Sequence, residues 1–424
     1  MADMAVDPES RREAASSSTF GNNMTLPVHR WFRYSAGFSA RWVENVIQGF
    51  SSDVPVRVFD PFAGSATTLL AAQRAGVESW GTEAHPFVYR IARAKLAWNS
   101  DATAYKDKIQ AIQRTALTLT PSLEGYPDLI LNCFGGATLE GLDRLRRALE
   151  IEHDESPAFE LAWLTLLTTL RKVSTAGTAQ WQYILPNKPK RSPQSIERAM
   201  FDAFTMIYQD MRIAGPAFSP PAHLFKSDAR TCEGIATGSI NLVITSPPYP
   251  NNYDYADATR LEMSFMREIS GWGDLHDKVR KYLMRSCSQH TPEKNHDLRE
   301  ILSAPELDSI RDEIQKVCAQ LSEIRATKGG KKTYHLMIAA YFRDIALVWL
   351  ALRRVCTTPC RVCFVIGDSA PYGVYVPVIE WMERLALAAG FSDCSFEKTR
   401  DRNIKWKNRK HRVPLQEGRF WVRG

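Results

Sequence analysis

The pattern of apolar and polar residues along the chain predicts strands that alternate with helical segments. Residues 240–244, Ile-Asn-Leu-Val-Ile, are almost continuously apolar, which is typical of a buried parallel strand. Strand-like patterns ending in polar residues recur at 54–60, 77–83 and 361–369, and the tail predicts two more strands at 393–399 and 419–422. Helical patterns fill most of 101–221 and 260–352. Strands alternating with helices predict an α/β fold.

The strand at 240–244 ends in an unusual segment, residues 245–249, which reads Thr-Ser-Pro-Pro-Tyr. Pro248 lacks an N–H group and holds Pro247 in an extended conformation, so the strand stops there. The result is a stiff, carbonyl-bearing elbow beside the ring of Tyr249. Open α/β sheets place their sites at the carboxyl ends of strands. Rigid acceptors next to a flat ring suit a planar heterocycle with an exocyclic amine.

A second motif follows the strand at 54–60, where residues 60–68 read Asp-Pro-Phe-Ala-Gly-Ser-Ala-Thr-Thr before a helical pattern. Small residues let the backbone approach a ligand, and the N–H groups of the helix start face it. A dinucleotide motif needs three spaced glycines, whereas only Gly64 is present, which argues against NAD. The next strand ends in Glu83, where an acid commonly bonds ribose hydroxyls.

Together, the Ser-Pro-Pro-Tyr segment and the Asp-Pro-Phe-Ala-Gly-Ser-x-Thr-Thr turn resemble the catalytic and cofactor motifs of the amino-methylating DNA methyltransferases. Those enzymes transfer a methyl group from S-adenosyl-L-methionine to cytosine N4 or adenine N6. The resemblance covers the sheet-forming parts, around half of the chain. It implies a Rossmann-like S-adenosylmethionine-dependent methyltransferase fold, with a mostly parallel seven-stranded sheet, a terminal antiparallel hairpin and helical insertions.

The resemblance also implies roles for individual residues. A polar loop before the turn would hold the methionine end of the cofactor, Glu83 the ribose and Asp228 the adenine amine. One departure is Ala66, which stands where the family commonly has glycine; a positive φ there would cost roughly 1 kcal/mol. The implied catalytic residues are Ser246, Pro247, Pro248 and Tyr249, and the implied cofactor-binding residues are Ser35, Gly37, Phe38, Ser39, Asp60, Pro61, Phe62, Ala63, Gly64, Ser65, Thr67, Thr68, Glu83, Asp228 and Thr245.

The expected reaction needs no covalent adduct, because an amine nitrogen can attack the methyl group directly. The target base would flip out of the duplex and stack on Tyr249, while Ser246 Oγ and the Pro247 carbonyl accept the amine hydrogens. Serine at the first motif position favours cytosine N4, since the adenine enzymes more often carry Asp or Asn there. The alternatives are an adenine-N6 enzyme, an RNA or glutamine methyltransferase, and a catalytically silent DNA-binding subunit.

Composition and charge fit a double-stranded DNA partner without requiring one. The chain has 424 residues, 44% of them hydrophobic, and a net charge of +7. Basic clusters read either as solvated surface or as phosphate contacts, and the polar, aromatic stretch after Tyr249 reads as a connecting loop or a wall around the extruded base. The DNA-binding candidates are Lys188, Lys190, Arg191, Asn252, Tyr253, Arg402, Lys405, Lys407, Arg409 and Lys410. A cognate restriction endonuclease is a further expected partner.

Cysteine usage and hydropathy favour a cytoplasmic, nucleoid-associated protein. Eight cysteines without framework spacing indicate free thiols in a reducing compartment. Cys356, Cys360 and Cys363 cluster, but Cys363 falls inside an apolar run and no fourth ligand is near, so no metal is expected. No continuous apolar stretch reaches the ~20 residues that span a membrane.

These observations divide the chain into a disordered leader and a methyltransferase domain with two helical insertions. The expected parts are the leader (1–22), the cofactor-binding half (23–100), a helical insertion suited to DNA recognition (101–222), the catalytic strand and loop (223–260), a second helical insertion (261–335) and the rest of the sheet with a basic hairpin (336–424).

Overall fold

The computed structural model describes residues 20–34, 37–179, 182–190, 192–214, 219–292, 296–329, 332–402 and 413–424. Residues 1–19 of the predicted leader lie outside this range. So do six of the predicted site residues: Ser35, Arg191, Lys405, Lys407, Arg409 and Lys410.

The centre of the fold is a seven-stranded sheet in the order β5-β2-β1-β6-β7-β9-β8. Neighbouring strands from β5 to β7 are parallel, whereas β9 is antiparallel to both β7 and β8. This confirms the predicted α/β class, the mostly parallel sheet and the terminal hairpin. The strands are β1 Val58–Asp60, β2 Ser79–Thr82, β5 Ala222–Phe225, β6 Ile240–Thr245, β7 Cys356–Gly367, β8 Asp393–Arg402 and β9 Leu415–Arg423.

The sequence pattern did not predict the edge strand β5. It has four residues, all of them only half-buried, so it offers neither an apolar run nor a clean alternation. Parallel pairing with β2 fixes it at the edge, and the Phe225 carbonyl accepts a hydrogen bond from Glu83 N, just past β2. Tertiary pairing, rather than local pattern, makes this strand.

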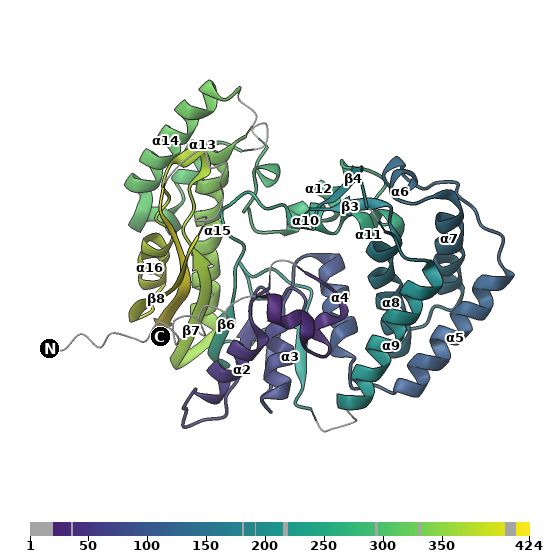
Figure 1. Cartoon of the computed structure of the whole chain (residues 1–424). Coiled ribbons are helices and arrows are strands. Elements are labelled where there is room, and N and C mark those ends of the chain that lie inside the picture. The colour runs from purple at the N-terminus through teal and green to yellow at the C-terminus, as the bar shows by residue number, and fades with distance from the viewer. Residues whose placement is uncertain are drawn as a thin grey trace.

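Helices cover both faces of the sheet, and alternate strand residues face opposite layers (Figure 1). On one side, α2 (Ala40–Gln48) and α3 (Thr67–Arg74) pack on Val58 and Leu242. On the other side, Phe59 and Val243 belong to the same core as α15 (Tyr334–Val355) and α16 (Val378–Ala388). Ser39 caps α2, since its hydroxyl accepts a hydrogen bond from Trp42 N at 3.3 Å.

Helix α15 has the length and apolar composition to cross a membrane, although charged residues interrupt its apolar sequence. However, 83% of its most apolar stretch is buried within the fold, as expected for a core helix.

The cysteine cluster divides between the two faces of the sheet: the thiols of Cys356 and Cys360 lie in the α15 layer, whereas Cys363 lies in the α2 layer. The three thiols therefore do not converge on one site.

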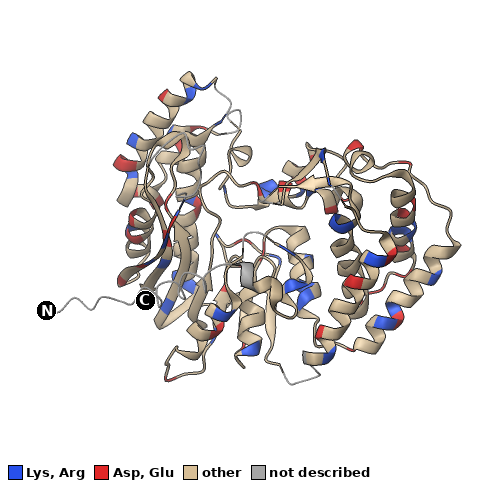
Figure 2. Cartoon of the chain, in the orientation of Figure 1, with Lys and Arg blue, Asp and Glu red and all other residues tan. Residues whose placement is uncertain are grey.

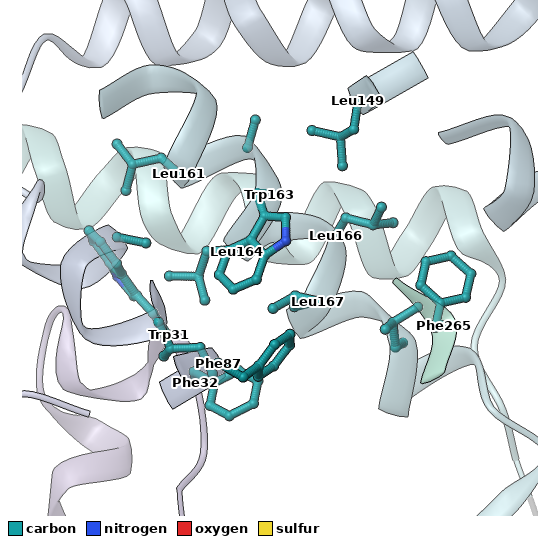
Figure 3. Packing of buried hydrophobic residues seen from close by; sticks show 14 of the residues in the cluster. Trp31, Phe32, Phe87, Leu149, Leu161, Trp163, Leu164, Leu166, Leu167 and Phe265 are labelled. Atoms are coloured by element: carbon teal, nitrogen blue, oxygen red, sulfur yellow. The ribbon is translucent and has the colours of Figure 1, made fainter. Parts of the chain in front are cut away.

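The first insertion forms a helical lobe beside the sheet (Figure 1). Its core is continuous with that of α4 (Pro86–Leu96), because Trp163 packs edge-on against Phe87 with ring centroids 5.4 Å apart (Figure 3). The elements of this lobe are α5 Ala102–Thr118, α6 Asp128–Cys133, α7 Gly136–Ile151, α8 Pro157–Val173, α9 Ile196–Ala214 and the antiparallel pair β3 Ala176–Thr178 and β4 Ile184–Pro189. Lysines and arginines alternate with acids over its outer helices (Figure 2).

The second insertion divides between the two sides of the molecule (Figure 1). Its first part approaches the helical lobe, and its last part packs on α15. The elements of this insertion, together with α10 in the predicted loop just before it, are α10 Tyr255–Ala258, α11 Arg260–Phe265, α12 Asp274–Lys278, η3 Arg280–Tyr282, η4 Ser288–His290, α13 Leu298–Leu302, η6 Pro305–Ile310 and α14 Arg311–Thr327. Three further 3₁₀ turns are η1 Phe20–Thr25, η2 His29–Trp31 and η7 Pro371–Gly373.

Candidate functional site

The turn between β1 and α3, residues 61–66, is held by Asp60 at the end of β1. The carboxylate of Asp60 is 1% exposed and accepts hydrogen bonds from Phe62 N (2.9 Å), Thr68 Oγ1 (2.7 Å) and Thr245 Oγ1 (2.5 Å). Burial raises the pKa of Asp60 to about 6, against the opposing effect of these bonds. Asp60 thus ties the 61–66 loop to strand β6, because it accepts hydrogen bonds from both Thr68 and Thr245.

Glu83 holds the same loop from the other side. Its Oε2 accepts a hydrogen bond from Gly64 N (2.8 Å), and its Oε1 accepts one from His85 N (2.7 Å). Burial raises the pKa of the Glu83 carboxyl to about 7, and the two backbone N–H groups oppose that rise. Each carboxylate oxygen still has a lone pair with which to accept a further hydrogen bond.

A pocket opens between the 61–66 loop, the end of β2 and the start of residues 245–249, the predicted catalytic segment. Among the described residues lining it there is no lysine or arginine, whereas two carboxyl groups and four aromatic rings face it. Carboxylates and ring faces attract cations, so this lining suits a positively charged ligand. The lining residues are Tyr34, Gly37, Phe38, Pro61, Phe62, Ala63, Gly64, Ser65, Thr67, Thr82, Glu83, Ala84, His85, Asp228, Ala229, Ser246, Pro248, Tyr255, Leu283 and Met284.

The catalytic segment enters this pocket through Ser246 and Pro248. The Ser246 hydroxyl donates its hydrogen to the carbonyl of Val365 on β7, at 3.0 Å. Because the hydroxyl hydrogen is already in this bond to Val365, the Ser246 oxygen can only accept a hydrogen bond from another group. Pro247 continues the extended segment and, as a proline, has no backbone N–H group.

The ring of Tyr249 lies beside this acceptor. Burial raises the pKa of Tyr249 well above its usual range, so it stays neutral. The guanidinium of Arg402 lies over the ring, 5.0 Å from its centroid, and donates to the carbonyl of Asp368 at 2.9 Å. Arg402 therefore packs against the catalytic segment, and one ring face of Tyr249 is already covered.

Of the predicted cofactor-binding residues, most of those in the described chain lie on this one pocket. Ser39 is instead the cap of α2, and Asp60, Thr68 and Thr245 form the hydrogen-bonded support behind the loop. Asp228 lines the pocket but is also bonded to Arg230, whose Nε lies 2.8 Å from its Oδ2. Ligand contact by these residues stays a prediction.

Sequence reasoning missed eight of the lining residues. Tyr34 adjoins the predicted Ser35, and His85 lies two residues after Glu83, so their neighbourhood could have indicated them. Leu283 and Met284 come from the second insertion, and no motif points to them. The missed residues are Tyr34, Thr82, Ala84, His85, Ala229, Tyr255, Leu283 and Met284.

The second insertion is fastened to the site by polar contacts on both sides of Leu283 and Met284. Arg280 pairs with the buried Asp254 at 2.7 Å, and Arg285 Nε donates to the buried Asp344 at 2.9 Å. Asn252 Oδ1 accepts from Ser288 N at 2.9 Å. These contacts explain how residues remote in sequence form one wall of the pocket.

The first insertion is also fastened to the segment after the catalytic motif. Tyr183 stacks on Tyr253 with centroids 5.5 Å apart, and its hydroxyl accepts from Asp254 N at 2.8 Å. Arg171 of α8 pairs with the fully buried Glu262 of α11 at 2.5 Å. The 249–262 segment therefore lies between the two insertions.

The described DNA-binding candidates mostly have internal partners. Lys190 Nζ donates to the carbonyls of Arg171 (3.1 Å) and Lys172 (3.0 Å) at the end of α8. Tyr253 is 9% exposed, and Arg402 packs on Tyr249. Lys188, by contrast, is exposed on β4. DNA contact by any of them stays a prediction.

Ala66 adopts the left-handed backbone that was expected to be costly, with φ 68° and ψ 32°. We expect Ala66→Gly to raise the free energy of unfolding by about 1 kcal/mol, because glycine adopts this conformation without strain. Ala63→Gly is the matched control: Ala63 is as buried but has no positive φ, so its replacement should destabilise the protein. Urea unfolding measures both; equal losses of stability would show that Ala66 is not strained.

Comparison with known proteins gives distant similarity over nearly the whole chain. The type II methyltransferase M.BsoBI of Geobacillus stearothermophilus is 23% identical over 416 residues, covering 87% of this chain and 79% of the relative. The type II methyltransferase M.AvaI of Nostoc sp. (strain PCC 7120 / SAG 25.82 / UTEX 2576) is 23% identical over 415 residues, covering 88% and 81%. No family model matches, and no solved structure matches.

Proposed function

We propose that this protein is a type II restriction-modification DNA methyltransferase that acts on the exocyclic N4 amine of cytosine in double-stranded DNA, with S-adenosyl-L-methionine as methyl donor. One observation carries the proposal: the acceptor Ser246 and the carboxylate Glu83 line the same pocket. The near full-length similarity to two type II methyltransferases supports it. A cognate endonuclease and a cytoplasmic location belong to the same proposal.

The pocket fits the cofactor chemically. S-adenosylmethionine supplies an electrophilic methyl group on a positively charged sulfonium when it is bound. The rings of Tyr34 and Tyr255 and the carboxyl group of Glu83 accommodate positive charge, and the described lining residues include no lysine or arginine. The second lining carboxylate, Asp228, is already paired with Arg230. Glu83 can accept bonds from ribose hydroxyls with its remaining lone pairs.

The residues of the catalytic segment position the target amine. Ser246 Oγ accepts one amine hydrogen because its own hydrogen is held by Val365, and the Pro247 carbonyl is the second acceptor in the proposal. Accepting these hydrogens draws the nitrogen lone pair out of the ring and towards the methyl group. Positioning of this kind is the main catalytic contribution available here. Arg402 covers one face of Tyr249, and the proposal places the flipped base against the other.

The assignment to cytosine rests on serine at the first motif position. Incubating unmethylated genomic DNA with the protein and cofactor, followed by nucleoside mass spectrometry, tests it. N4-methylcytosine is the expected product. N6-methyladenine would keep the proposed reaction but refute the choice of base, and methylation of RNA or protein alone would refute the substrate class.

Removing the ring of Tyr249 should weaken the complex with the flipped base. Base–aromatic stacking is worth about 1–3 kcal/mol, so we expect Tyr249→Ala to lower kcat/KM for DNA by roughly 5- to 150-fold. Tyr249→Phe keeps the ring and should stay close to the native value. Steady-state kinetics on a short duplex measure both, and an equal loss in the two variants would assign the effect to the hydroxyl instead.

A further inference from the structure

A buried lysine lies directly behind the cofactor loop, and the proposed mechanism does not use it. Lys95 projects from α4 and is 1% exposed. Its ammonium has two weak contacts, with the His29 carbonyl at 3.4 Å and with Ser65 Oγ at 3.5 Å. Ser65 itself lines the pocket. Ser65 therefore stands between a buried ammonium group and the ligand site.

This ammonium group is poorly compensated. No carboxyl group of the described residues forms an ion pair with it, and burial alone lowers the pKa of Lys95 to about 7. Its neighbour His29 is also buried, with both ring nitrogens lacking a hydrogen-bond partner, and burial with the nearby Lys95 and Arg74 keeps the pKa of His29 well below its usual range. A lone buried charge is costly, so an anionic ligand group that binds next to it offsets part of that cost.

The other charged groups around this place are accounted for. Asp210 pairs with Arg30 of η2 at 2.5 Å. The Glu83 carboxylate accepts a hydrogen bond from the backbone of the 61–66 loop. The Asp60 carboxylate accepts hydrogen bonds from the backbone of the same loop and from two threonine hydroxyls. None of these acids forms an ion pair with Lys95.

We propose that Lys95, acting through Ser65, supplies the positive charge against which the carboxylate of the methionine end of the cofactor binds. This rests on the proposed function, because S-adenosylmethionine is the ligand. The lining of the pocket suits the sulfonium and ammonium groups, and Lys95 behind Ser65 suits the one anionic group of the same molecule. Lys95 is thus a positioning residue rather than a group that touches the reacting atoms.

Decarboxylated S-adenosylmethionine tests this directly, since it lacks only the carboxylate. By calorimetry on the full chain, Lys95→Met should weaken binding of S-adenosylmethionine at least tenfold and leave binding of the decarboxylated analogue within about twofold of the native protein. Arg93→Met is the matched control. It removes a positive charge from the same helix, but its side chain is 54% exposed and pairs with Glu160, so both affinities should stay unchanged.

The pH dependence separates this role from a structural one. Above about pH 7 the native protein must take up a proton to bind the carboxylate, so its affinity should fall by up to tenfold per pH unit. Lys95→Met should lack that decline. Titrations of Asp60 and Glu83 occur in both proteins, and the difference between the two profiles cancels them.

Stability gives an independent readout with the opposite sign. Because the folded pKa lies below the unfolded one, the buried ammonium destabilises the fold most at pH values below 7, and this cost fades as pH rises towards the unfolded pKa. Lys95→Met should therefore melt at a higher temperature than the native protein at pH 6.5, while binding the cofactor less well.

Two outcomes would overturn the proposal. Equal weakening of both ligands, with a lower melting temperature, would make Lys95 a packing residue. Unchanged affinity for both ligands would remove Lys95 from the site. Failure of the native protein to bind either ligand would instead refute the proposed cofactor, which is a separate result.

Discussion

Replacing Ser246 by alanine is expected to lower the rate constant of methyl transfer by about 100-fold, the usual cost of one positioned polar group at a reacting centre. The hydroxyl is oriented for this task, because its hydrogen is donated to Val365 at 3.0 Å and its oxygen remains as acceptor. Single-turnover transfer of labelled methyl groups to DNA measures the change. Cofactor affinity, measured separately, should change by less than about threefold.

Ser369→Ala provides the control for Ser246→Ala. Ser369 Oγ also contacts the segment after the catalytic motif, donating to the Pro250 carbonyl at 2.5 Å, but Ser369 does not line the pocket. We expect it to cost less than tenfold in rate. If the two variants lose the same activity, the Ser246 hydroxyl supports the segment and does not act on the amine.

Replacing Glu83 by glutamine is expected to raise the Kd for S-adenosylmethionine by about 100-fold, equivalent to one or two hydrogen bonds to a charged group. Both carboxylate oxygens accept from backbone N–H groups, at 2.8 Å and 2.7 Å. An amide offers one oxygen, so its NH₂ would face a backbone N–H, and the 61–66 loop would lose one of its anchors. Equilibrium binding of the cofactor measures the loss.

Glu83 also predicts how cofactor affinity depends on pH. Its pKa is raised to about 7, so affinity in the native protein should fall as pH drops through 7 and the acceptor becomes protonated. Glu83→Gln should lack this acidic decline. Glu78→Gln, before β2 and paired with His223, is the control and should keep the native profile. A native profile that stays flat between pH 5 and 7 would contradict the role of Glu83.

The sequence predicted the parts of this protein that are set by local pattern. Strand ends followed by small residues or prolines identified the loop after β1, Glu83 and the catalytic segment, because each follows a buried strand in the chain. The parallel order of these strands then brings the three stretches to one edge of the sheet. Most of the described cofactor candidates consequently lie on one pocket.

Pattern alone could not show what depends on tertiary contacts. The sequence suggested Asp60 as a cofactor ligand, but its carboxylate accepts hydrogen bonds from Thr68 and Thr245. The sequence suggested Lys190 as a phosphate contact, but its ammonium group donates to a carbonyl at the end of α8. Leu283 and Met284 reach the pocket only because Arg280 and Arg285 are anchored elsewhere. Lys95 looks like an ordinary helix residue until its burial is seen.

The most direct test of the account is transfer of labelled methyl groups from S-adenosylmethionine to unmethylated genomic DNA, with the native protein, Ser246→Ala and Glu83→Gln compared side by side at saturating and limiting cofactor. The account predicts labelled DNA with the native protein, a loss in Ser246→Ala at all cofactor concentrations, and a loss in Glu83→Gln that high cofactor largely restores. Cofactor binding by the native protein without any labelled DNA would contradict it.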